Sequence, residues 1–229
     1  DTMSLPVKKD WKLSTIIQMK SIHPVRPRQD TAGKCTAYLQ NTISRNVLLK
    51  HDGSCKETAE EISYLESVQT ALDIALTEND LAEIKEELTN SGYIRRRYTK
   101  KKVKINNKPL HYISSDGFHI YVGKNNLQND QLTFHFAVGN DWWFHAKQAP
   151  GSHVIVRTNG AELPDHFEEA ARLAAYYSSM RGSDKVEIDY VEKKQVKKPG
   201  GGKPGFVVYY TNYSMVIDSN ISQIRLCAD

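Results

Sequence analysis

The 229-residue sequence lacks a long uncharged hydrophobic run. No stretch of about 18 uncharged apolar residues occurs, which argues against a transmembrane helix. The first thirty residues carry Lys8, Lys9 and Asp10 where a secretory signal would have an apolar core, so we expect no such signal. These absences favour a cytoplasmic protein that makes no membrane contact.

Cysteine is also scarce, with only Cys35, Cys55 and Cys227. Three scattered thiols do not make a disulfide framework, and no Cys-x-x-Cys pair suggests zinc. If residues 31–50 form a helix, Cys35 lies about 22 Å from the far end of that helix. A bridge to Cys55 beyond that end is then unfavourable, because bridged Cα atoms lie within about 7 Å of each other. We therefore expect reduced thiols, no bound metal and no cofactor.

Charge is divided into blocks along the chain. The net charge of +4 is the sum of +6 over residues 1–51, −9 over 52–92, +8 over 93–115 and −1 over 116–229. The third block contains no acidic residue at all. A strongly acidic segment is therefore followed directly by a strongly basic one.

The acid-free block has two possible roles. Its cations could neutralise phosphates while Tyr93 and Tyr98 stack on bases, as in proteins that bind nucleic acid. Alternatively, the block is a solvated linker that folds back on the acidic segment before it. If it binds nucleic acid, the candidate residues are Arg95, Arg96, Arg97, Lys100, Lys101 and Lys102.

The first part of the chain is predicted to be helical. Apolar residues recur every three or four positions over 31–50 and again over 62–76, which predicts an antiparallel hairpin suited to a coiled-coil arm. A third helix is predicted to begin at Thr77, with Asp80 completing a capping box, and to end at Gly92.

From residue 103 onward the apolar pattern is typical of strands, interrupted by one helix over 165–182. This order predicts an α+β domain with a largely antiparallel sheet. Adjacent Trp142 and Trp143 would point to opposite sheet faces, one into the core and one outward as a stacking candidate. The last two strands are predicted to pair as a hairpin. The predicted strands are 118–122, 132–136, 142–145, 153–157, 186–191, 206–210 and 213–217.

A polar segment, 123–130, lies between two of these predicted strands. Its Asn and Gln side chains offer paired donors and acceptors that suit base edges or ribose. The alternative is that these side chains build the turn by bonding to their own backbone. The candidate nucleic-acid contacts here are Lys124, Asn125, Asn126, Gln128, Asn129 and Asp130.

Two histidines lie close in sequence to an aspartate and a serine. A metal site would use Asp141, His145 and His153, but residues 141 and 145 are about 13 Å apart along a straight strand. A nucleophile pair of Ser152 and His153 is disfavoured because adjacent strand residues point to opposite faces. His145, Ser152 and His153 could instead bind a polyanion, or could be structural.

A second basic element spans 193–205 and contains three consecutive glycines. Pro204 follows Lys203, so the segment does not match an ATP-binding P-loop. Glycines let backbone approach a ligand closely while lysines supply charge, which favours contact with a phosphate backbone over a solvated hairpin tip. The candidate residues are Lys197, Lys198 and Lys203.

Several of these motifs together resemble the NFACT-R domain, which closes proteins of the NFACT family. The motifs are 116–130, Asp141-Trp-Trp-Phe-His145, Pro150-Gly-Ser-His-Val154 and the Lys-Pro-Gly segment 197–205. Upstream motifs, including Glu61-Ile-Ser-Tyr-Leu-Glu-Ser-Val68, resemble the middle coiled coil of that family. The resemblance divides the chain into a helical region 20–92, a basic linker 93–115 and an NFACT-R-like α+β domain 116–226.

The resemblance implies a non-catalytic RNA-binding module of a ribosome quality control factor. Its partners would be large-subunit ribosomal RNA and tRNA, with a ribosomal protein reached through the coiled-coil arm. The family's tRNA-selecting N-terminal domains have no counterpart here, so this chain alone is not expected to extend a nascent chain. Two alternatives stay open: a fibronectin-binding adhesin, and a metal-dependent hydrolase of the RNA-modification type that uses Asp141, His145 and His153.

Overall fold

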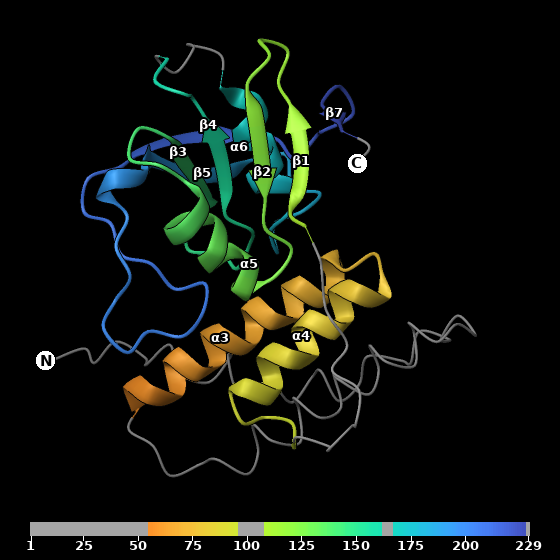
Figure 1. Ribbon diagram of the computed structural model, residues 1–229, viewed down its shortest axis with the longest axis vertical. Coiled ribbons are helices and arrows are strands. Elements are labelled where there is room, and N and C mark those ends of the chain that lie inside the picture. Colours follow the sequence, from red (N-terminus) through yellow and green to blue (C-terminus); the bar gives the residue numbers. More distant parts are fainter. Residues whose placement is uncertain (1–54, 96–107, 162–166, 228–229) are drawn as a thin grey trace, which may run out of the picture.

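The computed structural model describes residues 55–95, 108–161 and 167–227, and it confirms an α+β fold. A pair of helices lies against one end of a sheet domain (Figure 1). Within the described residues, no helix has both the length and the apolar character needed to cross a membrane.

The helix pair consists of α3 (Cys55–Ile74) and α4 (Glu78–Asn90). The two helices are antiparallel, because a short connection joins them while the first half of α3 contacts the residues just after α4. Tyr64 and Ser91 share a hydrogen bond of 3.0 Å between their hydroxyl groups, and Tyr93 donates to Glu61. The pair encloses an apolar core of its own. This core contains Tyr64, Leu65, Val68, Ala71, Leu72, Leu81, Ile84, Leu88, Tyr93 and Ile94.

Local sequence signals define both ends of α4. The Thr77 side chain accepts a hydrogen bond from the Asp80 backbone, and the Asp80 carboxylate accepts one from the Thr77 backbone at 2.9 Å. Gly92, just beyond the helix, has a φ of +79°, which a side chain would strain. The predicted capping box and the predicted end of this helix are both confirmed.

The hairpin predicted from 31–50 and 62–76 is only partly described. Its first helix lies outside the described residues, as does Cys35, whereas its second helix is α3. The helix that packs against α3 in the structure is α4. Cys227 is a free, half-buried thiol.

Seven strands of the described residues form one antiparallel sheet in the order β6-β5-β3-β4-β2-β1-β7. Most of the predicted strands are therefore confirmed, with shifts of one or two residues at their ends. The strands are β1 (Leu110–Ile113), β2 (His119–Val122), β3 (Trp142–Ala146), β4 (Val154–Arg157), β5 (Val186–Glu192), β6 (Tyr213–Ile217) and β7 (Arg225–Leu226).

Helices cover both faces of the sheet. Helix α6 (Glu168–Tyr176) lies behind the strands in Figure 1, and the core beneath it includes Phe144 and Leu173. Helix α5 (Asn126–Gln131) lies in front of the strands and continues into a π-helical turn, η1 (Leu132–Phe136). The core on this second face is smaller and contains Leu132, Ala137, Trp143, Ile155, Val191 and Val196.

The α5–η1 element corrects two predictions. The sequence predicts that residues 123–130 connect two strands and that 132–136 is a strand, yet both segments lie mainly in helix. Asn125 caps this helix, since its side-chain oxygen accepts a hydrogen bond from the Gln128 backbone at 2.9 Å. Leu132 and Phe136 are four residues apart, so they lie on one side of a helical turn and pack toward the sheet. Residues four apart also share a face of a strand, so this short apolar pattern fits either structure.

The end of the chain differs from its prediction as well. Strand β6 pairs with β5, not with 206–210, and Lys197 and Val208 form a single β-bridge. The helix predicted over 165–182 is shorter, and Asp165 lies outside the described residues. Neither tryptophan is free to stack outward: Trp143 is fully buried, and Trp142 is half-buried against Tyr190.

The capping box of α4 provides a test of this local structure. Thr77→Ala removes the side-chain acceptor for the Asp80 backbone, so we expect a loss of about 1 kcal/mol in the free energy of unfolding. Urea denaturation measures it. The control is Thr89→Ala near the other end of α4, where an exposed hydroxyl donates to the Lys85 carbonyl. Equal losses in both variants would contradict the capping role.

Candidate nucleic-acid interface

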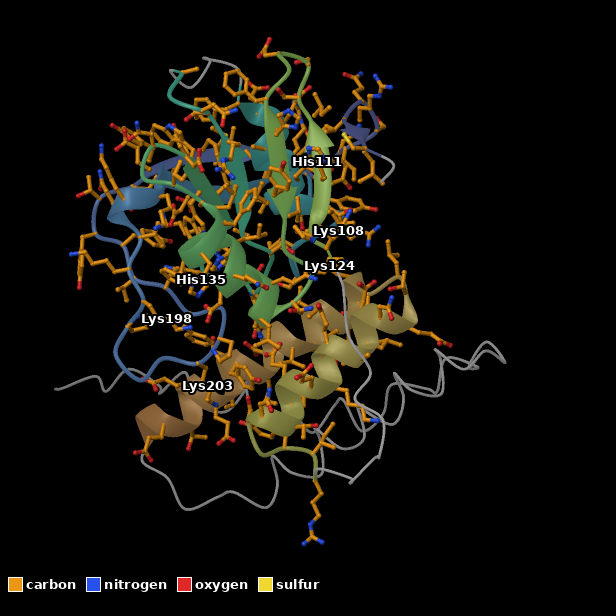
Figure 2. The ribbon with its side chains drawn as sticks, in the orientation of Figure 1. Lys108, His111, Lys124, His135, Lys198 and Lys203 are labelled. Atoms are coloured by element: carbon orange, nitrogen blue, oxygen red, sulfur yellow. The ribbon has the colours of Figure 1, made fainter. Side chains whose placement is uncertain are left out.

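A row of carboxylates on α4 faces the polar segment of the sheet domain. Asp80, Glu83 and Glu87 are spaced by three and four residues, which places them on one side of the helix. Each contacts a side chain from residues 124–128. Figure 2 shows Lys124 where the sheet domain meets the helix pair. We call this set of contacts the docking contact.

Lys124 and Asp80 form the charged part of the docking contact. The ammonium nitrogen lies 2.6 Å from Asp80 Oδ1, and the side chains are only 9% and 2% exposed. Asp80 Oδ2 also accepts hydrogen bonds from the backbone of Leu76 and Thr77. A buried carboxylate depends on such partners, because an uncompensated buried charge costs several kcal/mol.

Amide side chains satisfy the other two carboxylates. Asn125 and Gln128 both donate to Glu83 Oε2, at 2.6 and 2.8 Å. Asn126 donates to Glu87 Oε1 at 2.9 Å and to Ser67 Oγ at 2.8 Å. Burial raises the pKa of Glu87, whose Oε2 atom has no hydrogen-bond partner in the described part of the chain. This carboxyl is therefore held toward its neutral form.

The docking contact gives the polar segment a role that differs from the predicted one. Its Asn and Gln side chains are buried and bind the helix pair and the neighbouring loops. In this arrangement these side chains present little surface to a nucleic acid, and their predicted contact with it stays a prediction. The buried members are Lys124, Asn125, Asn126, Gln128 and Asn129.

Asn129 joins α5 to the loop before β4. Its side-chain oxygen accepts a hydrogen bond from the His153 backbone at 3.0 Å, and its nitrogen donates to the Gly151 carbonyl at 3.3 Å. Gly123 passes so close that a Cβ atom there would lie 2.2 Å from Asn129 Oδ1. The glycine is therefore required for this close approach of the two loops.

Asp130 connects α5 to the basic segment 193–205, which we call the glycine-rich loop. Asp130 pairs with Lys198 and also accepts a hydrogen bond from the Gly205 backbone at 2.9 Å. Gly205 has a φ of +81°, and a Cβ atom there would lie 2.6 Å from the Asn126 side chain. Asp130 thus positions a basic loop and is itself half-buried.

Lys203 turns toward the helix pair. Its ammonium group lies 4.5 Å from the centre of the Tyr64 ring and 3.3 Å from the Tyr93 hydroxyl. Tyr93 itself is buried and donates to Glu61 at 2.6 Å, so its ring is unavailable as the predicted stacking partner. In Figure 2, Lys198 and Lys203 both lie on the loop beside α3.

His145, Ser152 and His153 lie together beneath α5 and η1. The two histidine rings meet edge to face with 5.4 Å between their centres, and His153 shares a 2.8 Å hydrogen bond with Thr133. Ser152 and His153 are buried, and His145 is half-buried. Burial lowers the pKa of His145 to about 4 and holds that of His153 well below its usual range. These neutral rings are poor ligands for a polyanion.

Asp141 has a structural role. Its two carboxylate oxygens accept hydrogen bonds from the backbone of Val138 and Thr158, at 2.8 and 3.1 Å. Its side chain is fully buried, with the Arg157 guanidinium 3.6 Å away. Among the residues that the structure describes, no three His, Cys, Asp or Glu side chains form a group that could hold a metal ion.

Three of the predicted cationic contacts are exposed, namely Arg95, Lys197 and Lys198. These three residues, one just after α4 and two on the glycine-rich loop, therefore remain candidate contacts to nucleic acid. The remaining members of the basic block lie outside the described residues. These are Arg96, Arg97, Lys100, Lys101 and Lys102.

One polar surface was missed by the sequence analysis. Strands β1, β2 and β4 carry the half-exposed side chains of His111, His119, Tyr121 and Arg157 on the same sheet face. Strand alternation could have indicated that His119 and Tyr121 share a face. The partner from β1 follows from the pairing of β1 with β2, and Arg157 of β4 becomes evident only from the pairing of strands that are not consecutive in sequence.

Two family models match this chain in succession. Residues 108–210 match the NFACT protein RNA binding domain, and residues 50–107 match the NFACT N-terminal and middle domains. The first match extends from just before β1 to just beyond the glycine-rich loop. The second covers the helix pair and the first part of the basic block.

Curated relatives and a solved structure are also similar to this chain. The Rqc2 homolog RqcH of Streptococcus suis is 49% identical over 67% of this chain and 28% of its own length. The protein of the same name from Bacillus subtilis is 36% identical over 85% of this chain and 34% of its own length. The solved C-terminal part of the fibronectin/fibrinogen-binding protein from Streptococcus suis has a TM-score of 0.68 and 34% identity, covering 92% of this chain and 87% of that one.

The buried ion pair of the docking contact can be tested by removing its cation. Lys124→Met leaves the Asp80 charge buried without the ammonium group, so we expect a loss of about 3 kcal/mol in the free energy of unfolding. Combining it with Asp80→Asn should restore part of that loss. Urea denaturation measures both.

The matched control is Lys147→Met, because Lys147 pairs with Glu187 at the surface, where the two side chains are 35% and 48% exposed. Removing that pair should cost less than about 1 kcal/mol. If the Lys124 and Lys147 variants lost similar stability, the buried pair would not hold the helix pair to the sheet domain.

The lowered pKa of His145 predicts a pH dependence of stability. An unfolded histidine takes up a proton near pH 6.5, whereas folded His145 stays neutral to about pH 4. The unfolded state therefore binds more protons in this window, and the free energy of unfolding falls by on the order of 2–3 kcal/mol as the pH drops through it. The raised pKa of Glu87 acts in the opposite direction.

Replacing His145 isolates its contribution. His145→Gln should flatten the decline in unfolding free energy between pH 7 and pH 4.5, measured by urea titrations at several pH values. His135→Gln is the control, because His135 is exposed. Parallel curves for wild type and His145→Gln would show that the ring is not kept neutral by the fold.

Proposed function

Because this chain belongs to the NFACT family, we propose that it is a non-catalytic RNA-binding part of a ribosome quality control factor. The observation that carries this proposal is the match to the NFACT RNA binding domain over residues 108–210. That range includes β1 to β5, α5, α6 and the glycine-rich loop, which is most of the sheet domain.

We further propose that the complete protein acts on stalled large ribosomal subunits in the cytoplasm and directs C-terminal tailing of the nascent chain. This chain spans 28–34% of the length of the curated relatives it matches, so the complete activity would need additional domains. The partners of the present part would be ribosomal RNA and tRNA. The helical arm would reach a ribosomal protein.

The docking contact supports a defined geometry for this binding. Buried charge and amide contacts between α4 and residues 124–126, at the start of α5, hold the helix pair against the sheet domain. Contacts of this kind are lost together when two bodies separate, because each buried polar group would need a new partner. An arm seated on one ribosomal feature would therefore orient the RNA-binding domain toward another.

The exposed cations supply electrostatic attraction to phosphate. Arg95 lies at the end of the helix pair, and Lys197 and Lys198 lie on the glycine-rich loop. Each cation that neutralises a phosphate releases bound counterions, which makes affinity fall as salt rises. Salt dependence is therefore the direct test of this mode of binding.

A second candidate function comes from the solved structure named as a fibronectin/fibrinogen-binding protein. Fibronectin binding would call for a protein-recognition surface in place of cations directed at phosphates. Biolayer interferometry of this chain on immobilised fibronectin would discriminate the two. Binding to fibronectin that equals or exceeds binding to RNA at physiological salt would favour this candidate.

The RNA proposal predicts a steep dependence on salt. The chain should bind a labelled ribosomal RNA fragment in fluorescence anisotropy, with affinity falling steeply between about 50 and 200 mM salt. The double variant Arg95→Gln/Lys197→Gln should bind more weakly and reduce the slope of log K against log salt by about 1 to 2. Absence of binding at low salt, or binding insensitive to salt, would overturn the proposal.

A matched control removes a cation elsewhere. Lys185 is exposed and precedes β5, at the opposite end of that strand from the glycine-rich loop. The separation along seven strand residues is about 23 Å. Lys185→Gln should leave the slope closer to that of wild type than the double variant does.

A further inference from the structure

One face of the sheet is covered over only part of its area. Helix α5 and η1 lie in front of the sheet at the end nearer the helix pair, while α6 lies behind it (Figure 1). Toward β3 and β5 this front face is buried, as Trp143 and Val191 demonstrate. Toward β1 and β2 its side chains are half-exposed.

Strand register arranges the side chains of this face in two rows, which are half-exposed on β1 and β2 and buried toward β3. Because residues that pair across strands share a face, each row can be followed from strand to strand. The outer row is Arg225, Ile113, His119 and Arg157. The inner row is His111, Tyr121, Ile155 and Trp143. Neither row contains an acidic residue.

The rings in these rows are held in place by each other. His111 and Tyr121 stack with 4.6 Å between ring centres and 5° between planes. His119 stacks on His111 at 5.0 Å, and their ring nitrogens share a 2.8 Å hydrogen bond. Phe136 from η1 meets the Tyr121 ring edge to face at 4.7 Å. The surface is thus ordered before any ligand binds.

Cations lie at both ends of the outer row. The Arg157 guanidinium lies 4.5 Å from the centre of the Phe136 ring and is oriented by buried Asp141. Arg225 is exposed on β7, which lies three strands away from the β4 strand of Arg157. Three interstrand spacings correspond to about 14 Å. Figure 2 shows Lys108 just before β1 and His111 on it, at the edge of the sheet where β1 pairs with β7.

We propose that this surface, formed by His111, His119, Tyr121, Phe136, Arg157 and Arg225, binds unpaired bases of single-stranded RNA. Aromatic faces provide stacking that every base can use, and flanking arginines provide charge for the phosphates. A purely apolar protein partner would leave the exposed Arg225 guanidinium without a counter-charge. The inference rests on the proposed function and assigns it a specific site.

Stacking is measured directly with a fluorescent base. A twelve-nucleotide single-stranded RNA carrying one 2-aminopurine should lose fluorescence on binding wild-type chain, because stacking quenches that base. An oligonucleotide of equal length and charge with abasic positions should bind at least fivefold more weakly. This comparison uses the unmodified protein and does not depend on the stability of any variant.

Variants assign the effect to the surface. Tyr121→Leu keeps apolar volume but removes a ring, so affinity for single-stranded RNA should fall about tenfold while the salt slope stays that of wild type. Arg225→Gln should lower the salt slope. The control is Tyr213→Leu, because Tyr213 is an exposed ring on the opposite face and at the opposite edge of the sheet. Circular dichroism verifies that each variant is folded.

The outcomes separate this inference from the proposed function. RNA binding that persists with equal affinity for abasic and normal oligonucleotides, and with no quenching, would overturn base stacking and leave the RNA proposal standing. Tighter binding of a duplex than of the single strand would also overturn it, because paired bases are not available to stack. Absence of binding to every RNA at low salt would overturn both.

Discussion

The arrangement of this molecule depends on a buried contact of charged and amide side chains between α4 and the segment that begins α5, residues 124–128. Lys124 and Asp80 are almost fully removed from water, and Glu83 and Glu87 accept amide hydrogen bonds beside them. Such groups cannot be exposed one at a time without losing partners that water replaces only in part. The helix pair and the sheet domain are therefore joined by a polar contact with defined partners, beside apolar contacts such as that of Ile74 with the sheet core.

The same contact decides which polar residues can meet a partner. Asp80, in the acidic segment that contains α3 and α4, pairs with Lys124. The ammonium group of Lys203 lies over the ring of Tyr64 in α3. Cations on the rim, such as Arg95 and Lys197, stay exposed. An internal contact and an external nucleic-acid site use the same residue types, because both require donors and charge directed at oxygen atoms.

Two surfaces with different chemistry then result. The glycine-rich loop presents cations and is anchored through Asp130 to α5. The outer part of the sheet presents ordered rings between arginines, on strands that pair across more than a hundred residues of sequence. Both surfaces are positioned by α5 and η1, since this element covers only one part of the sheet and holds the loop on its other side.

Sequence alone determined the features that depend on a few neighbouring residues. The capping box of Thr77 and Asp80, the end of α4 at Gly92 and most strands follow from local hydrogen bonding and apolar period. Tertiary structure decided that 126–136 is helical, that β6 pairs with β5, and that Asn126 is buried. Those outcomes depend on groups such as Glu87, which is 39 residues away from Asn126. A local sequence pattern does not indicate which distant residue will pack against a given side chain.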